Sequence, residues 1–293
     1  MAVNLETLDF NAIAKRETAA RRGSWVIFCV AALVTLIWLV PFYYLVVSVF
    51  KSTAEYGSGN PLSLPVSLAP IVGNVIKVWT DAKLGWGMLN SATYGLIGAG
   101  IAVVVAALAA FGLTRLDFSG KTFWFMLIFA GTIFPFQMYL IPLFFTYQHV
   151  GILNTRFGMI LFYTAICVPF PVLVLKNYMA QLNREMDEAA RMDGASDLRV
   201  FLSIVLPNCR GTMIALFLLQ FTWIWNDLLF STVLGNTPEI RSVMNALQVF
   251  QGSYSASGPN IVLTGSLLAS IPSVLLFVLL RKHFMAGLSV AAH

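Results

Sequence analysis

Charged side chains are scarce in this sequence. Lys, Arg, Asp and Glu make up 11% of its 293 residues, and hydrophobic residues make up 58%, whereas a soluble domain carries about 25% charged residues. A water-soluble protein of this length needs far more charge to cover its surface. The composition therefore excludes a soluble enzyme and a disordered tail, and it predicts a protein of the lipid bilayer.

Cysteine and histidine are also rare, with three residues of each type. The cysteines lie far apart and form no CxxC pair: Cys29, Cys167 and Cys209. Neither a disulfide framework nor a zinc site is indicated. The histidines lie in different regions, and no Ser-His-Asp set or carboxylate pair lies inside an apolar run. A membrane enzyme is therefore the weaker hypothesis, and no metal site is predicted.

A phosphate-binding loop is missing as well. The P-loop requires the pattern G-x4-G-K-[ST]. The one partial match is Gly120-Lys121-Thr122, and Arg115 stands where the first glycine is needed. We therefore expect this chain to bind no nucleotide and no other cofactor itself.

Six long apolar runs are present instead. A membrane-spanning helix needs about 20 mostly apolar residues. Runs of about that length cover 25–50, 88–111, 123–145, 157–175, 212–234 and 261–280. Asp227 is the single charged residue within them. Prolines interrupt the third and fourth runs, either as gating hinges or as kinks that improve packing.

Basic residues near the ends of the runs predict the orientation. With six spans both termini share one side, and that side carries 13 basic residues against five on the other. We therefore expect both termini in the cytoplasm. The net charge of +5 reflects this topology, and because the basic residues form no patch, no nucleic-acid partner is expected.

This topology predicts the domain organisation. Residues 1–22 form a cytoplasmic arm, 23–50 the first transmembrane helix, 51–87 an external loop with a short surface helix, 88–280 a five-helix core, and 281–293 a cytoplasmic tail. Within the core, the cytoplasmic loop 176–210 holds 10 of the 31 formal charges. A polar insert of this size predicts contact with a soluble partner.

A motif with fixed spacing lies in that loop. Glu188-Ala189-Ala190 is followed after three residues by Gly194, and after nine more by Ile204-Val205-Leu206-Pro207. Glycine can take the positive φ that ends a helix, Ser196 can cap a second helix, and Pro207 can end that helix. We predict a knob of two short helices with these charged side chains exposed: Glu185, Asp187, Glu188, Arg191 and Arg199. An ordinary amphipathic connection is the alternative.

The motif resembles the EAA-x3-G-x9-I-x-LP signature of the membrane subunits of ABC importers, and it matches at all seven fixed positions. Further segments are similar to carbohydrate permeases of the maltose-permease kind: 88–91, 142–144, 151–155, 169–170, 225–230 and 284–288. The chain is similar to the smaller, six-span member of a permease pair. It departs from these permeases at 208–211, where they usually have another proline, and at 289–293, where they often end in a stretch with glycine and lysine.

The resemblance implies an all-α membrane protein with six transmembrane helices, the type I ABC importer permease fold and a cytoplasmic coupling-helix loop. It also implies contact with the ATPase subunit through these residues: Glu188, Ala189, Ala190, Asp193, Gly194, Ala195, Ile204, Leu206 and Pro207. The expected location is the bacterial inner membrane.

The partners implied by the resemblance are a second permease in a heterodimer, two copies of an ATPase that binds ATP and Mg²⁺, an external or periplasmic solute-binding protein, and membrane lipid. The expected cargo is a sugar or sugar derivative. An osmolyte or phosphorylated polyol is the first alternative. An ion-coupled secondary transporter is the second, although it would want several intramembrane ionisable residues and internal repeats.

A polar stripe is expected on the fifth span. Gln220, Trp223, Asp227 and Ser231 are spaced three or four residues apart, so they share a face if the span is one helix. Polar groups in hydrocarbon are costly. We therefore take Gln220, Trp223, Asn226 and Asp227 as candidates for the substrate path or gate, with hydrogen bonding to a neighbouring helix as the alternative. We expect the partner permease or water to hold the Asp227 carboxylate.

Overall fold

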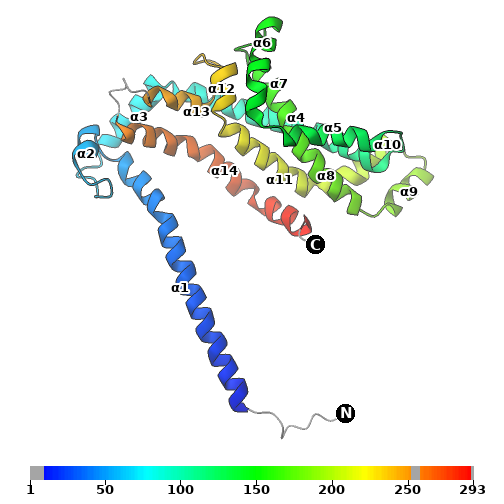
Figure 1. Cartoon of the computed structure of the whole chain (residues 1–293), viewed down its shortest axis with the longest axis horizontal. Helices are drawn as coiled ribbons and strands as arrows, with labels where there is room; N and C mark the ends of the chain where they lie inside the picture. Colours follow the sequence, from blue (N-terminus) through cyan, green and yellow to red (C-terminus); the bar gives the residue numbers. More distant parts are fainter. Residues whose placement is uncertain (1–9, 252–257, 292–293) are drawn as a thin grey trace.

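The computed structural model describes residues 10–251 and 258–291, with side chains described for 25–251 and 258–281. The predicted arm 1–22 and tail 281–293 lie almost wholly outside the described side chains. Within the described ranges the chain is helical and contains no strand (Figure 1). The elements are α1 (Phe10–Val49), α2 (Thr53–Ser58), α3 (Pro70–Asp81), α4 (Leu84–Arg115), α5 (Lys121–Ile133), η2 (Phe136–Tyr139), α6 (Leu140–Val150), α7 (Arg156–Cys167), α8 (Pro169–Gln181), α9 (Glu185–Met192), α10 (Asp197–Val200), η3 (Phe201–Val205), α11 (Leu206–Trp225), α12 (Leu229–Leu234), α13 (Val243–Leu247), η4 (Gln248–Phe250) and α14 (Pro259–Ala291).

Four stretches of the described residues are long and apolar enough to cross a membrane as unbroken helices. They are Trp25–Val49, Leu84–Arg115, Asp197–Trp225 and Pro259–Arg281. The two other predicted spans are bent pairs, α5 with η2–α6 at 97° and α7 with α8 at 40°. The predicted number of six holds when each bent pair counts as one span.

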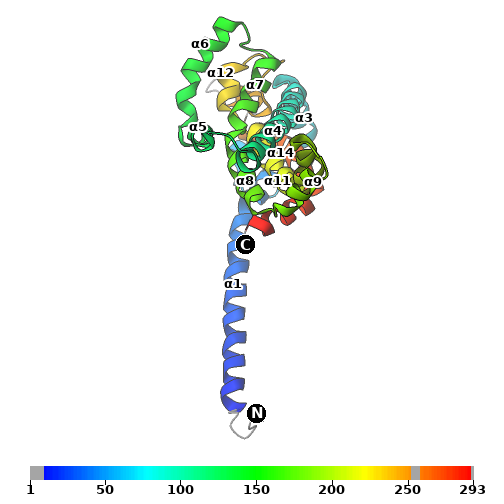
Figure 2. The ribbon, with the colours of Figure 1, turned by 90° about the vertical axis from the view of Figure 1, so that its right-hand side faces the viewer.

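The prediction that proline interrupts the run 123–145 is confirmed, and the interruption is a sharp break ahead of Pro135. α5 ends at Ile133, and Phe134 has extended dihedrals (φ −70°, ψ 134°). Because proline clashes with a helical residue before it, Phe134 leaves the helix ahead of Pro135. Figure 2 shows α6 rising away from α5 after this break. The helix that resumes therefore runs in a different direction.

The prediction that Pro207 ends the second helix of the knob is wrong. α10 continues through η3, a single π-helical turn, into α11, so that one helix runs from Asp197 to Trp225. The Leu206 N–H donates to the Phe201 carbonyl five residues earlier. This wider turn gives room to the ring of Pro207, which has no N–H of its own to donate. The knob is therefore continuous with the fifth span.

α4 is the central helix of the body and packs against α7, α8, α11 and α13. Its approach to α11 requires glycine at position 95, because an added Cβ would lie 2.6 Å from the Phe221 ring. One buried cluster surrounds Tyr94 and Trp225. A second surrounds Phe111 and Phe201 toward the knob. The knob therefore rests on a packed base.

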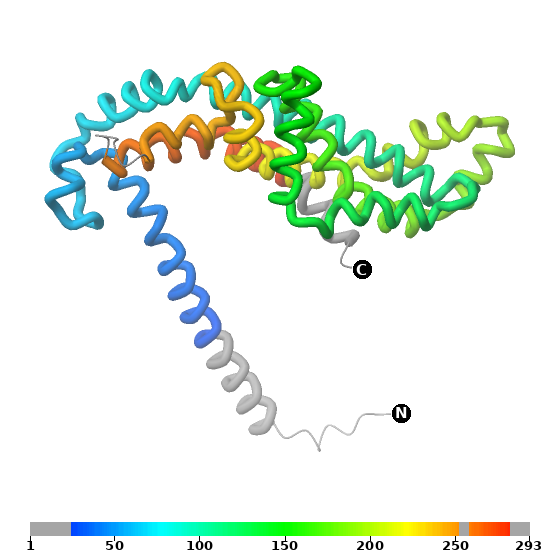
Figure 3. Tube along the Cα trace, turned by 45° about the horizontal axis from the view of Figure 1, so that its top comes forward, coloured from blue at the N-terminus to red at the C-terminus, as the bar shows by residue number. Residues whose placement is uncertain are grey.

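α1 stands apart from the body. The most apolar stretch within Trp25–Val49 is not buried against the rest of this chain. Only the end of the helix near Val47 and Val49 is covered, and α14 and α3 cover it. Figures 1 and 3 show the helix projecting from the end of the body that carries α2 and α3. Its apolar surface is therefore available to lipid or to another membrane helix.

Candidate functional site

The knob predicted at 185–205 lies at the end of the body opposite α2 and α3 (Figure 1). Gly194 has φ +83°, as predicted for the residue that ends α9. The Ser196 hydroxyl accepts a hydrogen bond of 3.4 Å from the Arg199 N–H and caps α10. The Ala195 N–H closes the turn onto the Ala190 carbonyl at 2.9 Å. The predicted turn at Gly194 and the predicted cap at Ser196 are confirmed, whereas the second helix is the first part of the long helix Asp197–Trp225.

The motif residues divide into two groups. The exposed group presents its side chains or backbone at the surface: Glu188, Ala189, Asp193, Gly194 and Pro207. The second group packs against the cluster around Phe111 and Phe201: Ala190, Ala195, Ile204 and Leu206. Only the first group is accessible for direct contact with another protein. The second group attaches the knob to the body.

Asp187 does not lie on the surface, contrary to the sequence-based expectation. Its Oδ2 lies 2.7 Å from Nε of Arg115, and the two side chains are 3% and 2% exposed. Arg115 Nη2 also donates to the Leu182 carbonyl at 3.0 Å. Arg184 donates to the Thr114 carbonyl at 3.1 Å. These contacts hold α9 against the end of α4, because a charge without a partner is costly in the interior.

One exposed ion pair lies within the knob and a second lies beside it. Arg191 of α9 lies 2.8 Å from Asp197 of α10 and ties the two helices together. In the turn after α4, Lys121 donates a hydrogen bond of 2.9 Å to Asp117. This bond lowers the pKa of the Asp117 carboxyl, and Arg184 and Arg191 act weakly in the same direction. Charges of both signs are therefore exposed on and next to the knob.

The predicted continuous stripe on the fifth span is interrupted. α11 ends at Trp225, and α12 begins at Leu229. Gln220 and Trp223 remain on α11, whereas Asn226 and Asp227 lie in the break. Ser231 is buried on α12 and accepts a hydrogen bond of 2.7 Å from the Ser242 N–H. Ser231 therefore holds the following segment and does not belong to a path.

Asp227 is held within this chain, although we expected another permease or water to hold it. Its carboxylate accepts hydrogen bonds from the Tyr163 hydroxyl at 2.8 Å and from the backbone N–H groups of Phe230 at 3.3 Å and Ser231 at 3.0 Å. The side chain thereby caps the first turn of α12. It also joins the break to α7. Asp227 lines a pocket of about 480 Å³ together with Trp223 and Asn226.

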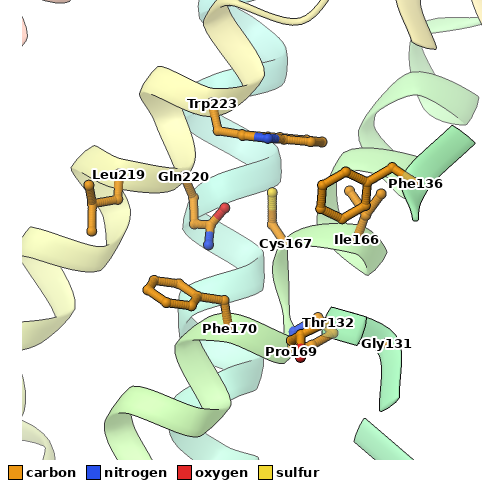
Figure 4. Close-up of a pocket in the computed structure, with 10 residues that line it drawn as sticks. All are labelled: Gly131, Thr132, Phe136, Ile166, Cys167, Pro169, Phe170, Leu219, Gln220 and Trp223. Atoms are coloured by element: carbon orange, nitrogen blue, oxygen red, sulfur yellow. The ribbon is translucent and has the colours of Figure 1, made fainter. Parts of the chain in front are cut away.

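A second pocket, of about 400 Å³, is also lined by Trp223 (Figure 4). Its lining comes from the α5–η2 break, the α7–α8 bend and α11: Gly131, Thr132, Phe136, Ile166, Cys167, Pro169, Phe170, Leu219, Gln220 and Trp223. Of the four candidates for a path, the structure places Gln220 and Trp223 here. Trp223 is shared with the pocket near Asp227.

Three residues that contact the candidate site residues could not be predicted from the sequence. Arg115 counts in the sequence only as a basic residue at the end of a span, and the sequence assigns no role to Tyr163 or Phe136. Only the Pro135 that precedes Phe136 signalled a break. Residues 67 and more positions apart meet in the fold, as Arg115 and Leu182 do, and spacing in one sequence does not report such pairs.

We expect Asp227→Leu to lower the yield of folded protein, because it leaves the Tyr163 hydroxyl and two N–H groups without an acceptor, at about 1–3 kcal/mol for each buried group. Asp227→Asn keeps an acceptor oxygen and should give near-normal yield. Tyr163→Phe removes one partner and tests the pairing in a double-mutant cycle. Detergent-extracted yield and uptake are measured together. Full yield and full uptake in Asp227→Leu would remove Asp227 from both roles.

A comparison with known families matches residues 102–289 to the family described as "Binding-protein-dependent transport system inner membrane component". The chain is 32% identical over 276 residues to the diacetylchitobiose uptake system permease protein NgcG of Streptomyces coelicolor, covering 92% of this chain and 88% of that protein. It is 28% identical over 260 residues to the osmoprotective compounds uptake permease protein GgtD of Synechocystis, covering 87% of each.

The fold is also known. A chain in the crystal structure of a bacterial ABC transporter involved in the import of the acidic polysaccharide alginate superposes with a TM-score of 0.77 at 22% identity, covering 91% of this chain and 98% of that chain. The helical architecture of an ABC importer permease, predicted from the motif, is thereby confirmed. The chain therefore belongs to the multi-pass inner-membrane permease subunits of binding-protein-dependent ABC importers, which carry no catalytic domain and work with an ATPase and a binding protein.

Proposed function

We propose that this permease imports a sugar or sugar derivative. The observation that carries the proposal is the 32% identity, along nearly the whole chain, to a permease named for diacetylchitobiose uptake. The pocket of about 400 Å³ supports it, because aromatic rings and an amide with no charged side chain suit a neutral, hydroxyl-rich solute.

The assembly in this proposal is a heterodimer with a second permease, served by two copies of an ATPase that binds ATP and Mg²⁺. The exposed apolar surface of α1 supports a large membrane-embedded interface. The exposed residues of the knob, Glu188 and Asp193 among them, meet the ATPase. The knob, both termini and the ATPase then share the cytoplasmic side, and the binding protein delivers solute from the other side.

The test is ATP hydrolysis by the complex assembled from this permease, the second permease, the ATPase and the binding protein in lipid. We expect binding protein loaded with N,N′-diacetylchitobiose or maltose to stimulate hydrolysis, and glycine betaine to have no effect. Because a cytoplasmic ATPase reaches the knob only in the proposed orientation, its co-purification also tests the topology. Failure of every sugar to stimulate hydrolysis would overturn the proposed cargo.

An osmolyte is the second candidate cargo, because a relative of 28% identity is named for osmoprotective compounds. The same assay separates the two. Stimulation by glycine betaine and not by the sugars would establish the alternative, and the coupling arrangement at the knob would stand unchanged.

A further inference from the structure

The pocket next to Trp223 is a product of the two backbone breaks in this chain. α5 ends before Pro135, and α8 begins at Pro169. At each break the helices diverge, by 97° and by 40°. The cavity of about 400 Å³ lies between these breaks and α11. Its volume lies within the range of about 300–1,000 Å³ that is usual for sites of small molecules.

Two uncharged polar side chains with oxygen or amide groups line this cavity: Thr132, whose hydroxyl donates to the Phe129 carbonyl at 2.7 Å, and Gln220, which reaches in from α11. Gln220 is only 8% exposed, and its amide has no hydrogen-bond partner among the described residues. Figure 4 shows the amide pointing into the cavity between Trp223 and Phe170. Buried amides are normally hydrogen-bonded. An amide left free at a cavity wall therefore suits a ligand that supplies the missing donors and acceptors.

Trp223 also presents a polar group without a partner among the described residues, on the adjacent wall of the cavity. Its indole N–H has no partner within the part of the chain that the structure describes. By contrast, the N–H of Trp225, two residues later, donates to the Ala269 carbonyl at 3.0 Å. Phe136 and Tyr163 both form T-shaped pairs with Trp223, with ring centroids 5.7 Å and 6.5 Å away. The indole is therefore braced while part of its surface faces the cavity.

The chemistry of the lining selects a class of ligand. None of the described lining residues is charged, and a charged ligand would lose its hydration here without a counter-charge. A sugar ring carries C–H groups on its faces and hydroxyls at its rim. The C–H groups can pack on the rings of Trp223 and Phe170, and the hydroxyls can bond to the Gln220 amide, which both donates and accepts.

We propose that this pocket is a subsite for one neutral sugar ring of the transported solute, with Gln220 as the residue that selects its hydroxyl pattern. The inference rests on the proposed sugar cargo and adds that this subunit itself binds the sugar. It disfavours a phosphorylated polyol, whose charge would have no partner in the cavity.

The first measurement is uptake of radiolabelled N,N′-diacetylchitobiose and maltose by the assembled complex in vesicles. Gln220→Leu keeps the size of the side chain and removes its hydrogen bonds, so we expect the KM for the transported sugar to rise about tenfold, as for a lost hydrogen bond to the ligand. Complex yield should not change. Gln148→Leu on α6 is the matched control, because Gln148 is exposed and lines neither pocket.

The second measurement uses Cys167, which is buried and lines the cavity. In a Cys29→Ala, Cys209→Ala background it is the one remaining cysteine. Methyl methanethiosulfonate should modify it more slowly when the transported sugar and binding protein are present than when mannitol replaces the sugar. This result does not depend on how well the Gln220 variant folds.

Each outcome either supports or overturns the proposed subsite. An unchanged KM in Gln220→Leu, or an unchanged rate of Cys167 modification, overturns the subsite. A loss of complex yield in Gln220→Leu, together with no protection of Cys167, shows that the partner permease fills the cavity. If no sugar stimulates the wild-type complex, the proposed function fails. If sugars stimulate the wild-type complex and only these tests fail, the subsite alone is wrong.

Discussion

Replacing Gly194 with valine is expected to abolish uptake while the permease still inserts into the membrane in normal amount. Gly194 has φ +83°, and an added Cβ would meet no atom within 4 Å, so the strain comes from the backbone alone. A left-handed residue costs roughly 1–2 kcal/mol, more when it is β-branched, and about 1.4 kcal/mol changes an equilibrium constant tenfold. The population with a correctly formed knob should fall accordingly.

The measurements are uptake, ATPase co-purification and hydrolysis of ATP with and without loaded binding protein. We expect the ATPase either to dissociate or to hydrolyse ATP regardless of solute. Gly194→Asn should keep most of the activity, because asparagine tolerates this backbone conformation. Gly211→Val is a control for added bulk, since Gly211 has an ordinary helical conformation and open space. Normal uptake in Gly194→Val and in Glu188→Ala would show that the motif is only a connector.

Breaking the Arg115–Asp187 pair is expected to have the largest effect on stability. Arg115→Met leaves the Asp187 carboxylate buried without its partner and frees the Leu182 carbonyl. The loss of one member of a buried pair costs about 3–5 kcal/mol. We expect a strongly reduced yield and a lower midpoint of thermal unfolding in detergent for Arg115→Met. The hydrolysis that remains should respond less to solute, because α9 is no longer held to α4.

The double variant Arg115→Met, Asp187→Leu tests whether the unpaired Asp187 carboxylate causes the loss of stability. A buried pair replaced by apolar side chains is often neutral for stability, so yield should return toward that of the wild type. Arg191→Met is the matched control: it breaks the exposed pair with Asp197, and exposed pairs contribute about 0–1 kcal/mol. If Arg115→Met is no more destabilising than Arg191→Met, the buried pair does not hold the knob.

The segments that resemble carbohydrate permeases could be found in the sequence, but the sequence does not show what their residues contact. Asn90 and Ser91 belong to one of them, and nothing in their spacing assigns them a role. In the fold, the Asn90 amide donates to the carbonyls of Glu239 and Arg241 at 2.9 and 3.1 Å. Ser91 accepts from the Val243 N–H at 2.9 Å. These residues hold the segment between α12 and α13, a contact that spans some 150 positions.

Several features of this protein follow from the sequence by itself. Apolar runs long enough to cross a bilayer must become helices there, because backbone groups in hydrocarbon have no other partners. The knob could also be predicted, since Gly194 and Ser196 act on their nearest neighbours in the chain. Local rules also located the break before Pro135, although not the size of the bend.

Only the tertiary structure decided the environment of each charge and the shape of the site. The position of Asp187 in a polar loop predicts an exposed side chain. In the fold, α4 brings Arg115 to Asp187, and both side chains are buried. The hydrophobic pattern predicts that Asp227 lies within a helix. In the fold it lies in the break between α11 and α12, where it accepts hydrogen bonds from Tyr163 and from the first turn of α12. Burial and pairing depend on which helices pack together, and helix packing depends on surfaces contributed by residues far apart in the chain.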